Sequence, residues 1–335
     1  MRAMVLNAPN ELLALTDVHM PAPRASGILL RVEACAVCRT DLHIFHGELT
    51  APYLPLILGH QIVGTVVKKG KRATRFQVSD RVGVSWLGQT CGGCRFCQQG
   101  RENLCTSAQF TGYHLNGGFA EFCCADERYC FPLPSAFSPI SLAPLLCGGL
   151  IGWRAFRLAS SFKKFGFYGF GSAAHILIQL ATLEKKKVYA FTRPGDLAAQ
   201  RLAEKLGAVW AGSSEESPPT PLEAALIFAP IGALVPQALQ AVAPGGSVIC
   251  LGIHMSDIPA FPYSLLYQER SLTSVANLTR QDGETFFARI KGETITTKTT
   301  IYPLEQANEA LRDLDGGKIT GSAVISVASS SEKGC

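Results

Sequence analysis

The stretch Phe165-Gly-Phe-Tyr-Gly-Phe-Gly-Ser-Ala-Ala174 decides the fold, because it joins an apolar run to the start of a helical segment. It contains the pattern Gly-x-Gly-x-x-Ala. Gly169 and Gly171 allow a tight turn and a close approach of the backbone to a pyrophosphate, and the small Ala174 lets helix and strand pack closely. The N-terminus of the helix favours a phosphate. A plain turn is the alternative, but the position of the pattern at the head of alternating strands and helices favours a dinucleotide-binding unit.

Short apolar strands alternate with helical segments after residue 150. The expected strands are 165–170, 187–192, 208–212, 224–229 and 247–252. The expected helices are 172–184, 196–206 and 234–242, with no clear helix between the third strand and the fourth. Parallel strands need crossover connections, so this alternation predicts an α/β fold with a doubly wound parallel sheet of the Rossmann type in residues 151–275.

The first 150 residues are mostly strand and turn. Residues 28–34 alternate apolar and polar side chains, and 62–68 and 80–86 are short β-rich runs, which together predict a small barrel-like domain. Residues 276–335 lose the alternation and are expected to pack back on the first domain, with disorder in the Ser-rich stretch 326–335. A chain of 335 residues is long enough for two cores.

Four of the twelve cysteines have the spacing Cys91-x2-Cys94-x2-Cys97-x7-Cys105, within a Gly- and Gln-rich loop. Zinc takes four thiolates tetrahedrally at about 2.3 Å, and two-residue gaps let neighbouring thiolates converge on one ion. The spacing therefore predicts a closed zinc site with a structural role. Two disulfides, or four unrelated thiols, are the alternatives. Disulfides concentrate in small secreted domains and are less typical of a chain of this size.

A closed zinc site would also suit a non-enzymatic zinc-binding module. The basic and aromatic face that nucleic acid requires is not evident, because only Arg95, Phe96, Arg101 and Phe110 lie near the cluster. The formal charge of +5 is small for this length, and the Lys and Arg residues are scattered. We therefore expect no nucleic-acid partner.

The N-terminus lacks the apolar core and cleavage site of a secretory signal. Residues 129–153 and 224–256 carry no Asp, Glu, Lys or Arg. Each stretch contains several prolines or glycines, which a membrane helix of about 20 residues seldom carries. We expect a cytoplasmic protein that does not associate with a membrane.

Further motifs follow one another along the chain. Cys38-Arg-Thr-Asp-Leu-His43 is followed by Gly59-His-Gln-Ile-Val-Gly64, by the four-cysteine segment, by Gly117-Gly-Phe-Ala-Glu-Phe122 and by Cys147. With the Rossmann pattern, this ordered set resembles the zinc-containing medium-chain alcohol dehydrogenases over nearly the whole chain. The resemblance implies a mostly-β GroES-like catalytic domain in residues 1–150 and an NAD(P)-linked alcohol dehydrogenase activity.

The resemblance also implies a catalytic zinc held by Cys38, His60 and Cys147, which makes two Zn²⁺ ions per chain with the four-cysteine site. The fourth coordination position would be open to water or a substrate oxygen, as alcohol oxidation needs. Asp41 would orient the histidine ligand. One residue departs from the family pattern, since Gln61 replaces the usual Glu. Any role of that carboxylate in ligand exchange is therefore in doubt.

A proton relay is implied by two further residues of the Cys38 motif. Thr40 would receive the proton of the alcohol and pass it, through the nicotinamide ribose, to a surface histidine, His43. An imidazole titrates near neutrality and suits this task. The alternative is that Thr40 is an ordinary helix cap and that His43 is simply exposed.

Cofactor specificity is expected at the end of the second strand, where an acidic residue would bind the ribose of NAD. The sequence Ala190-Phe-Thr-Arg193 has no acid there. Arg193 suits the 2'-phosphate of NADP, whereas Thr192 suits a ribose hydroxyl, so both cofactors stay open. Arg39 resembles the pyrophosphate contact of the family.

Trp86 resembles an aromatic residue that lines the substrate pocket in microbial members of the family, with Tyr113 near it; a core tryptophan is the alternative. We expect primary alcohols or their aldehydes as substrates. A polyol or secondary-alcohol dehydrogenase is the first alternative, although such enzymes often replace one thiolate by a carboxylate. Zinc-free quinone or enoyl reductases lack the metal ligands. The resemblance implies a homo-oligomer, either a dimer or a tetramer.

Overall fold

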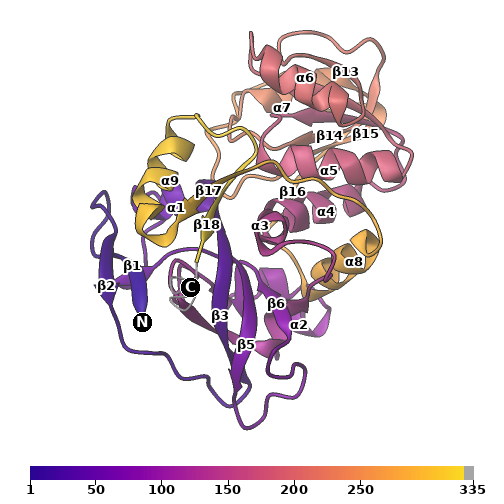
Figure 1. Cartoon of the computed structure of the whole chain (residues 1–335). Coiled ribbons are helices and arrows are strands. Elements are labelled where there is room, and N and C mark those ends of the chain that lie inside the picture. Colours follow the sequence, from indigo (N-terminus) through magenta and orange to yellow (C-terminus); the bar gives the residue numbers. More distant parts are fainter. Residues whose placement is uncertain (328–335) are drawn as a thin grey trace. The chain divides into compact units, whose positions relative to one another are not determined.

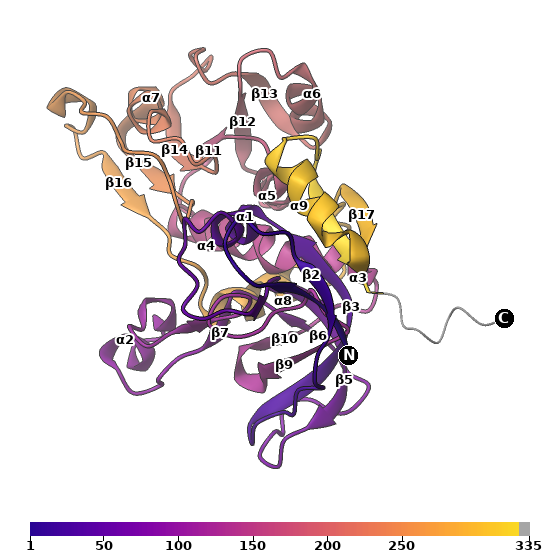
Figure 2. The same ribbon diagram turned by 90° about the vertical axis from the view of Figure 1, so that its left-hand side faces the viewer.

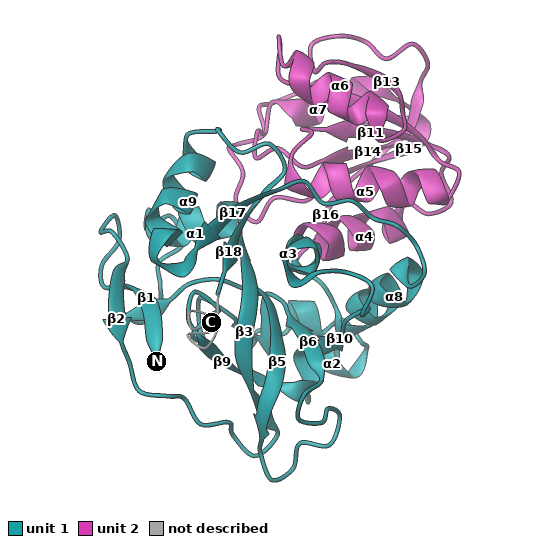
Figure 3. Ribbon diagram, in the orientation of Figure 1, with its two compact units in different colours: residues 1–147, 278–335 teal, residues 148–277 magenta. Residues whose placement is uncertain are grey.

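The computed structural model describes residues 1–327 (Figure 1). It forms two compact units (Figure 3). Unit 1 contains Met1–Cys147 and the segment from Leu278 onward, and unit 2 contains Gly148–Asn277. The predicted disorder of residues 326–335 is wrong for Ser326, which ends a strand, and residues 328–335 lie outside the described part of the chain.

Unit 1 is built around one long strand, β3 (Gly27–Val37). Antiparallel β5 (Gln61–Lys69) pairs along one edge of β3. The other edge is shared, because β9 (Phe122–Asp126) pairs with its first half and β18 (Ser322–Ser326) with its second. The sheet continues to β6 (Arg81–Val84) and β10 (Cys130–Pro132) beyond β5, and to β17 (Thr299–Pro303) beyond β18.

Smaller elements complete unit 1. Two further sheets are β2-β1-β4, formed by Ala14–Asp17, Arg2–Leu6 and Leu56–Ile57, and β7-β8, formed by Leu87–Gln89 and Gln109–Phe110. The α-helices are α1 (Arg39–Phe45), α2 (Arg95–Gln98), α3 (Pro139–Leu142), α8 (Arg280–Ile290) and α9 (Ala307–Asp315). Its short 3-10 helices are η1 (Glu102–Leu104), η2 (Glu127–Tyr129), η3 (Ala143–Leu146) and η5 (Leu304–Gln306).

The core of unit 1 joins segments from both ends of the sequence. Ile28, Leu30 and Ile62 of the central strands are completely buried in one cluster with Ala323 and Ile325 of β18. Helix α9 packs against β17, β18 and α1 (Figure 2). Burial of such side chains contributes about 1.5–3 kcal/mol each, so the segment after Leu278 is an integral part of unit 1.

Unit 2 is a six-stranded parallel sheet in the order β13-β12-β11-β14-β15-β16. Its strands are β11 (Lys164–Tyr168), β12 (Lys187–Thr192), β13 (Ala208–Ser213), β14 (Leu222–Ile227), β15 (Val242–Cys250) and β16 (Ser271–Ser274). Its helices are α4 (Gly148–Leu158), α5 (Ser172–Leu183), α6 (Leu197–Lys205), α7 (Leu234–Ala241) and η4 (Tyr263–Leu265).

Helices cover both faces of this sheet. Leu239 of α7 packs in one cluster with Tyr168 and Ile227, on one face. The side chain of Phe165 lies on the opposite face of β11 from that of Tyr168 and is also completely buried. Its ring lies 5.3 Å from that of Phe156 in α4. Burial on both faces explains the nearly continuous apolar runs of the strands. The predicted doubly wound parallel sheet is confirmed.

No single helix within residues 1–327 is long and apolar enough to span a membrane. The helices of residues 139–146 and 148–158 together have that length and composition, but they form a bent pair.

Candidate active site

Three predicted ligands come together in unit 1. The ligand atoms of Cys38, His60 and Cys147 all lie within 4.8 Å of one another, and Cys38 Sγ lies 3.3 Å from His60 Nε2. Each residue stands at the end of a regular element: Cys38 follows β3 and precedes α1, His60 precedes β5, and Cys147 follows η3. The three ends of different elements therefore converge on one point.

The buried carboxylate of Asp41 holds two of these ligands in place. Its Oδ2 accepts the backbone N–H of Cys38 at 2.9 Å, and its Oδ1 accepts that of Gly59 at 3.2 Å. The same Oδ1 lies 3.4 Å from His60 Nδ1. With Nδ1 directed at this carboxylate, Nε2 of the imidazole is the nitrogen presented to the cluster, as in histidines that ligate metals.

Gly59 sets the path of the backbone into His60. Its φ of 93° lies in the left-handed region. A Cβ atom at this position would lie 2.5 Å from the ring of Phe119 and 2.8 Å from the sulfur of Cys35. Only glycine therefore fits at this turn.

The charges of this cluster are mutually dependent. Burial lowers the pKa of His60, but the Cys38 thiolate and Asp41 carboxylate outweigh burial and raise it to about 10. A hydrogen bond with Cys147, together with burial, raises the pKa of the Cys38 thiol well above its ordinary value. A divalent cation that binds two thiolates and a neutral imidazole must displace these protons, so binding is coupled to proton release.

Gln61, the residue that departs from the family pattern, pairs with Ala36 through its backbone in the β3–β5 ladder. Its side chain is only 2% exposed, and its Nε2 has no hydrogen-bond partner within residues 1–327. The amide adds no charge next to the cluster. Two thiolates and one neutral imidazole would therefore balance a divalent cation.

The two predicted relay residues lie on α1. Thr40 and His43 are three residues apart, a spacing that places side chains on one helix face. The predicted surface position of His43 is wrong, because its side chain is buried and its Nδ1 contacts the carboxylate of Glu48. Glu48 was not predicted from the sequence; a carboxylate five residues after the histidine was the one available signal.

The four cysteines of the second motif also converge. Their sulfur atoms lie within 4.8 Å of one another, with pairs at 3.5 Å (Cys105 to Cys91), 3.6 Å (Cys94 to Cys97) and 4.0 Å (Cys91 to Cys97). Sulfurs about 2.3 Å from a central zinc are about 3.8 Å apart at tetrahedral corners. The alternative of two disulfides is wrong, since these four cysteines are all free.

Backbone amides favour the thiolate form in this cluster. The N–H of Cys94 donates to Cys91 Sγ at 3.4 Å, and this bond, with one from Gly93, lowers the pKa of Cys91 to about 6. A thiolate is the form that binds zinc. No ligand position remains open among four thiolates, so the chemistry of the cluster suits a structural ion.

Glu102, in the η1 turn between these cysteines, joins the cluster to α8. Its carboxylate accepts the backbone N–H of Arg280 at 2.9 Å and the guanidinium Nε at 3.1 Å. The Arg280 guanidinium also lies 5.5 Å from the centre of the Tyr129 ring. No local sequence pattern indicates this contact, because its partners are 178 residues apart.

The predicted phosphate turn of unit 2 has the geometry that its glycines suggest. Gly169 has a φ of 89°, and a Cβ atom there would lie 2.8 Å from Ala229. Gly171 is the N-cap of α5, and a Cβ atom on it would meet no described atom within 4 Å. Ala174 is completely buried in the first turn of the helix. The helix N-terminus is therefore open to an anion while its inner side is tightly packed.

Thr192 ends β12, Arg193 follows it, and the two side chains differ in accessibility. The Thr192 hydroxyl donates toward the carbonyls of Arg193 at 3.1 Å and Gly212 at 3.3 Å, and it accepts from Gln200 at 3.1 Å. The side chain of Arg193 is 78% exposed and lies 3.7 Å from Asp196. The hydroxyl is therefore occupied within unit 2, whereas the guanidinium is accessible.

Arg39 lies at the first position of α1 and is half exposed. Its guanidinium lies 3.6 Å from the carboxylate of Asp315 in α9, and His46 Nε2 lies 3.1 Å from the same carboxylate. Arg39 thus has a surface counter-ion, a contact that the sequence did not predict. A pair this exposed is weak and leaves the guanidinium able to bind another anion.

Trp86 is buried beside the metal-ligand cluster. Its ring meets that of His60 edge-on at 5.1 Å and stacks on Phe110 at 5.0 Å and on Tyr113 at 5.8 Å. The three stacked rings form an aromatic wall next to a predicted zinc ligand. The predicted proximity of Tyr113 is confirmed.

Comparisons with known proteins agree with this fold. The sequence model of the family "Alcohol dehydrogenase GroES-like domain" matches residues 24–135. Among solved structures, cinnamyl alcohol dehydrogenase SbCAD4 from Sorghum bicolor superposes with a TM-score of 0.90 at 20% identity, covering 100% of this chain and 99% of that chain. A thermostable alcohol dehydrogenase from Pyrobaculum aerophilum gives 0.89 at 24% identity, covering 97% and 99%. A GroES-like unit joined to a parallel Rossmann sheet is thus the class of protein.

The sequence relatives are more specific. The chain is 42% identical over 321 residues to the "Probable alcohol dehydrogenase AdhA" of Mycobacterium tuberculosis (strain CDC 1551 / Oshkosh), covering 93% of this chain and 92% of the relative. It is 32% identical over 339 residues to an alcohol dehydrogenase of Geobacillus stearothermophilus, covering 97% and 98%. The chain belongs to the alcohol dehydrogenase family, as an NAD(P)-linked oxidoreductase. The predicted family and enzyme class are confirmed, and the alternative of a non-enzymatic zinc-binding module is not supported.

Proposed function

We propose that this alcohol dehydrogenase is zinc-dependent and interconverts primary alcohols and aldehydes, with Cys38, His60 and Cys147 as ligands of its catalytic zinc. The observation that carries the proposal is the convergence of these three ligand atoms within 4.8 Å. Their chemistry fits the ion, since zinc catalytic sites use three protein ligands of the sulfur and nitrogen type and keep the fourth position open. The buried Asp41 supports the site by holding His60.

A second zinc at the four-cysteine cluster is the other part of the proposal. The sulfur separations of 3.5–4.0 Å suit tetrahedral coordination, and Glu102 ties the cluster to α8. This ion would stabilise unit 1 and take no part in the reaction. We therefore expect two zinc ions per chain.

When bound, the catalytic zinc would supply a Lewis acid that polarises the oxygen of the alcohol or aldehyde. The residues of the chain perform the remaining tasks. Cys38, Cys147 and His60 hold the ion, and Asp41 fixes the orientation of the imidazole. Thr40 and His43 are proposed to carry the hydroxyl proton away along one face of α1, with the contact to Glu48 fixing the ring of His43.

NADP is the cofactor that we propose. The N-terminus of α5 offers the phosphate turn, and no acidic side chain occupies the end of β12. Arg193 is accessible there and carries the charge that a 2'-phosphate requires, whereas the Thr192 hydroxyl is already hydrogen-bonded. Arg39 is proposed as a further contact to the pyrophosphate.

The substrate is proposed to pass along the aromatic wall of Trp86, Phe110 and Tyr113. The flat faces of these rings favour aldehydes with planar or slender substituents over a polyol, because an aromatic face does not hydrogen-bond the many hydroxyl groups of a polyol well. A secondary alcohol carries two substituents on the reacting carbon and is bulkier at that point. Primary alcohols and their aldehydes are therefore the proposed substrate class.

A homo-oligomer is proposed to form through β16. This strand ends the sheet of unit 2, and within residues 1–327 its outer edge has no paired strand. Tyr263 and Tyr267, just before it in the sequence, are 72% and 61% exposed. An exposed strand edge with apolar neighbours favours pairing with a second copy. Dimer and tetramer both stay predictions, as does the cytoplasmic location.

The test combines metal content with turnover. We expect purified protein to hold two zinc ions per chain and to reduce short and aromatic aldehydes, faster with NADPH than with NADH. Cys38→Ser is expected to leave one zinc ion per chain and no turnover. Cys124→Ser, outside both clusters, is expected to retain two zinc ions and full turnover. A single zinc ion that Cys38→Ser does not remove, with no turnover on any aldehyde, would contradict the proposal.

A further inference from the structure

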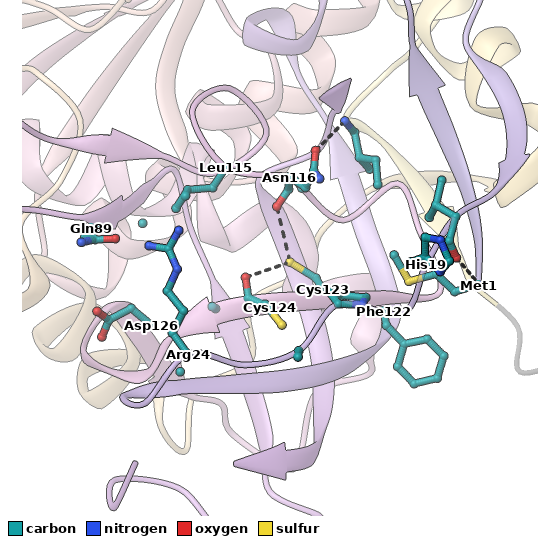
Figure 4. A pocket seen from close by; sticks show the side chains of 18 of the residues that line it. Met1, His19, Arg24, Gln89, Leu115, Asn116, Phe122, Cys123, Cys124 and Asp126 are labelled. Carbon is teal, nitrogen blue, oxygen red and sulfur yellow. Dashed lines mark hydrogen bonds between the residues drawn. The ribbon is translucent and has the colours of Figure 1, made fainter. Parts of the chain in front are cut away.

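Unit 1 contains a cavity of about 480 Å³ that none of the proposed catalytic residues line (Figure 4). Its walls come from the segment after β2, the turn after β5, the loop before β9, and β9 itself. The residues that line it include neither metal ligands nor the relay residues. The cavity is therefore distinct from the site described above, and its size is that of a small-molecule site.

Part of the wall is apolar. Five different segments line it with apolar residues: Val5, Val18, Ile57, Leu115 and Phe122. An apolar wall inside a cavity favours a ligand that has an apolar body, because contact with it removes apolar surface from water.

The charged residues that line the cavity are mostly arginines: Arg24, Arg72 and Arg128 face a single carboxylate, Asp126. That carboxylate is already engaged by Arg128, which donates through its backbone N–H at 3.0 Å, Nε at 2.9 Å and Nη2 at 2.6 Å. Arg24 and Arg72 are both exposed, and within residues 1–327 their guanidinium groups form no ion pair. Two solvated positive charges are therefore available to an anionic ligand.

The backbone holds these two arginines close together. The N–H of Arg72 donates to the carbonyl of Ala25 at 2.7 Å, and that of Gly70 donates to the carbonyl of Gly27 at 2.8 Å. A Cβ atom on Gly70 would lie 2.0 Å from the carbonyl oxygen of Arg24. The two segments are thus in direct contact, so the backbone places both arginines on the same side of the cavity.

Neutral hydrogen-bond donors complete the lining. Figure 4 shows the side chain of Arg24 extending into the cavity, toward the side that carries Gln89 and Leu115. Asn116 uses its Oδ1 to accept the N–H of Ile57 at 3.1 Å, which leaves its amide nitrogen able to donate. This nitrogen and the guanidinium groups of Arg24 and Arg72 are donors that an oxyanion can use.

We propose that this cavity binds a small amphipathic organic anion, a carboxylate joined to an apolar chain or ring. The carboxylate would be held by the forked guanidinium groups of Arg24 and Arg72, which match its two oxygens. The apolar body would lie against Leu115, on the side toward which Arg24 extends. Inorganic phosphate satisfies only the charged part of this site, and a neutral alcohol of the same length satisfies only the apolar part.

The test is calorimetric titration of the zinc-loaded protein with octanoate, with octanol and with inorganic phosphate. We expect octanoate to bind once per chain at this cavity and more tightly than either of the other two probes. Arg24→Gln and Arg72→Gln are each expected to weaken this binding event about tenfold or more. Arg201→Gln, an exposed arginine of α6, is the matched control and should leave it unchanged.

Three results would overturn the proposal. If octanol binds as tightly as octanoate, the cavity is apolar and its arginines do not bind the carboxylate. Phosphate that binds as tightly would show that the apolar wall contributes nothing. Octanoate binding that neither arginine substitution weakens would place the ligand elsewhere, at the metal-ligand cluster in particular. Thermal unfolding of each variant confirms that any loss of binding occurs in folded protein.

Discussion

Oδ1 of Asp41 lies 3.4 Å from Nδ1 of His60, and the two side chains are 0% and 1% exposed. An unpaired buried carboxylate is costly, but this one also accepts the backbone N–H groups of Cys38 and Gly59. One carboxylate thereby connects both predicted ligands that flank it in the sequence.

Asp41→Asn is expected to weaken zinc binding at the catalytic site about 10- to 100-fold, the usual effect of losing a partner behind a metal ligand. The amide keeps one oxygen for the backbone N–H groups but loses the charge that faces His60. The effect is measured as the amount of zinc that stays bound to the protein as the concentration of a chelator is increased. The exposed Asp17→Asn is the control. Equal retention in Asp41→Asn and wild type would contradict this role.

Glu102→Gln is expected to lower the free energy of unfolding by about 1–3 kcal/mol at pH 7, because the buried acceptor of the two Arg280 bonds loses its negative charge. Burial raises the pKa of Glu102, but the hydrogen bonds from the backbone and guanidinium of Arg280 outweigh burial, so the pKa lies below its ordinary 4.5. A carboxyl group whose pKa is lower in the folded state stabilises the fold at pH values above its unfolded-state pKa. This contribution is lost as the pH falls through its folded-state pKa.

The difference between wild type and Glu102→Gln should therefore be constant near neutrality and narrow below about pH 4.5. Urea unfolding of zinc-loaded protein at several pH values measures it. Glu284→Gln on α8 removes an exposed partner of Arg75 and is expected to change stability by less than about 1 kcal/mol. A difference that widens on acidification would contradict the assignment.

Trp86→Phe is expected to widen the space beside His60 and to shift specificity toward bulkier aldehydes. Lost or gained contacts of this size change kcat/KM by roughly tenfold, so the ratio for cinnamyl-type over two-carbon aldehydes should rise by about that factor. Trp153→Phe, in α4, is the matched control and should leave the ratio unchanged. If the ratio does not change in either variant, Trp86 is a core residue only.

Arg193→Gln is expected to lower kcat/KM for NADPH by about 10- to 100-fold, since it removes a charge-assisted bond to the 2'-phosphate. The value for NADH should change little, because NADH lacks that phosphate. Arg201→Gln, on the following helix, controls for a general loss of positive charge. Equal effects on both cofactors would mean that Arg193 does not contact the 2'-phosphate.

The buried parallel strands were the most predictable elements. The expected strand at 187–192 has the observed bounds, because its side chains are apolar on both faces. Strand β16 was missed, since Ser271–Ser274 is an exposed edge with few apolar side chains. Helix α4 was missed because Gly148, Gly149 and Gly152 are poor helix formers, and burial decides its conformation instead.

The site was predictable only as a set of candidates. The motifs and their order predict the residues that converge, including Cys38, His60 and Cys147. They do not predict the side chains that hold these residues in place. Glu48 and Glu102 bind partners that no local pattern links to them. Such contacts depend on how distant segments meet, which spacing within a motif does not encode.

The place of β18 beside β3 has a consequence for biosynthesis. Ala323 pairs with Val37, and Ser326 pairs with Ala34, so the second half of β3 finds this neighbour only in a segment that is translated much later. The whole of unit 2 leaves the ribosome before that strand does. Unit 2 can therefore complete its sheet before unit 1 does, against the usual order in which the N-terminal domain folds first. Until β18 has been synthesised, the second half of β3 lacks this partner strand. An unpaired strand edge favours aggregation, so the nascent chain would most need a chaperone during this interval.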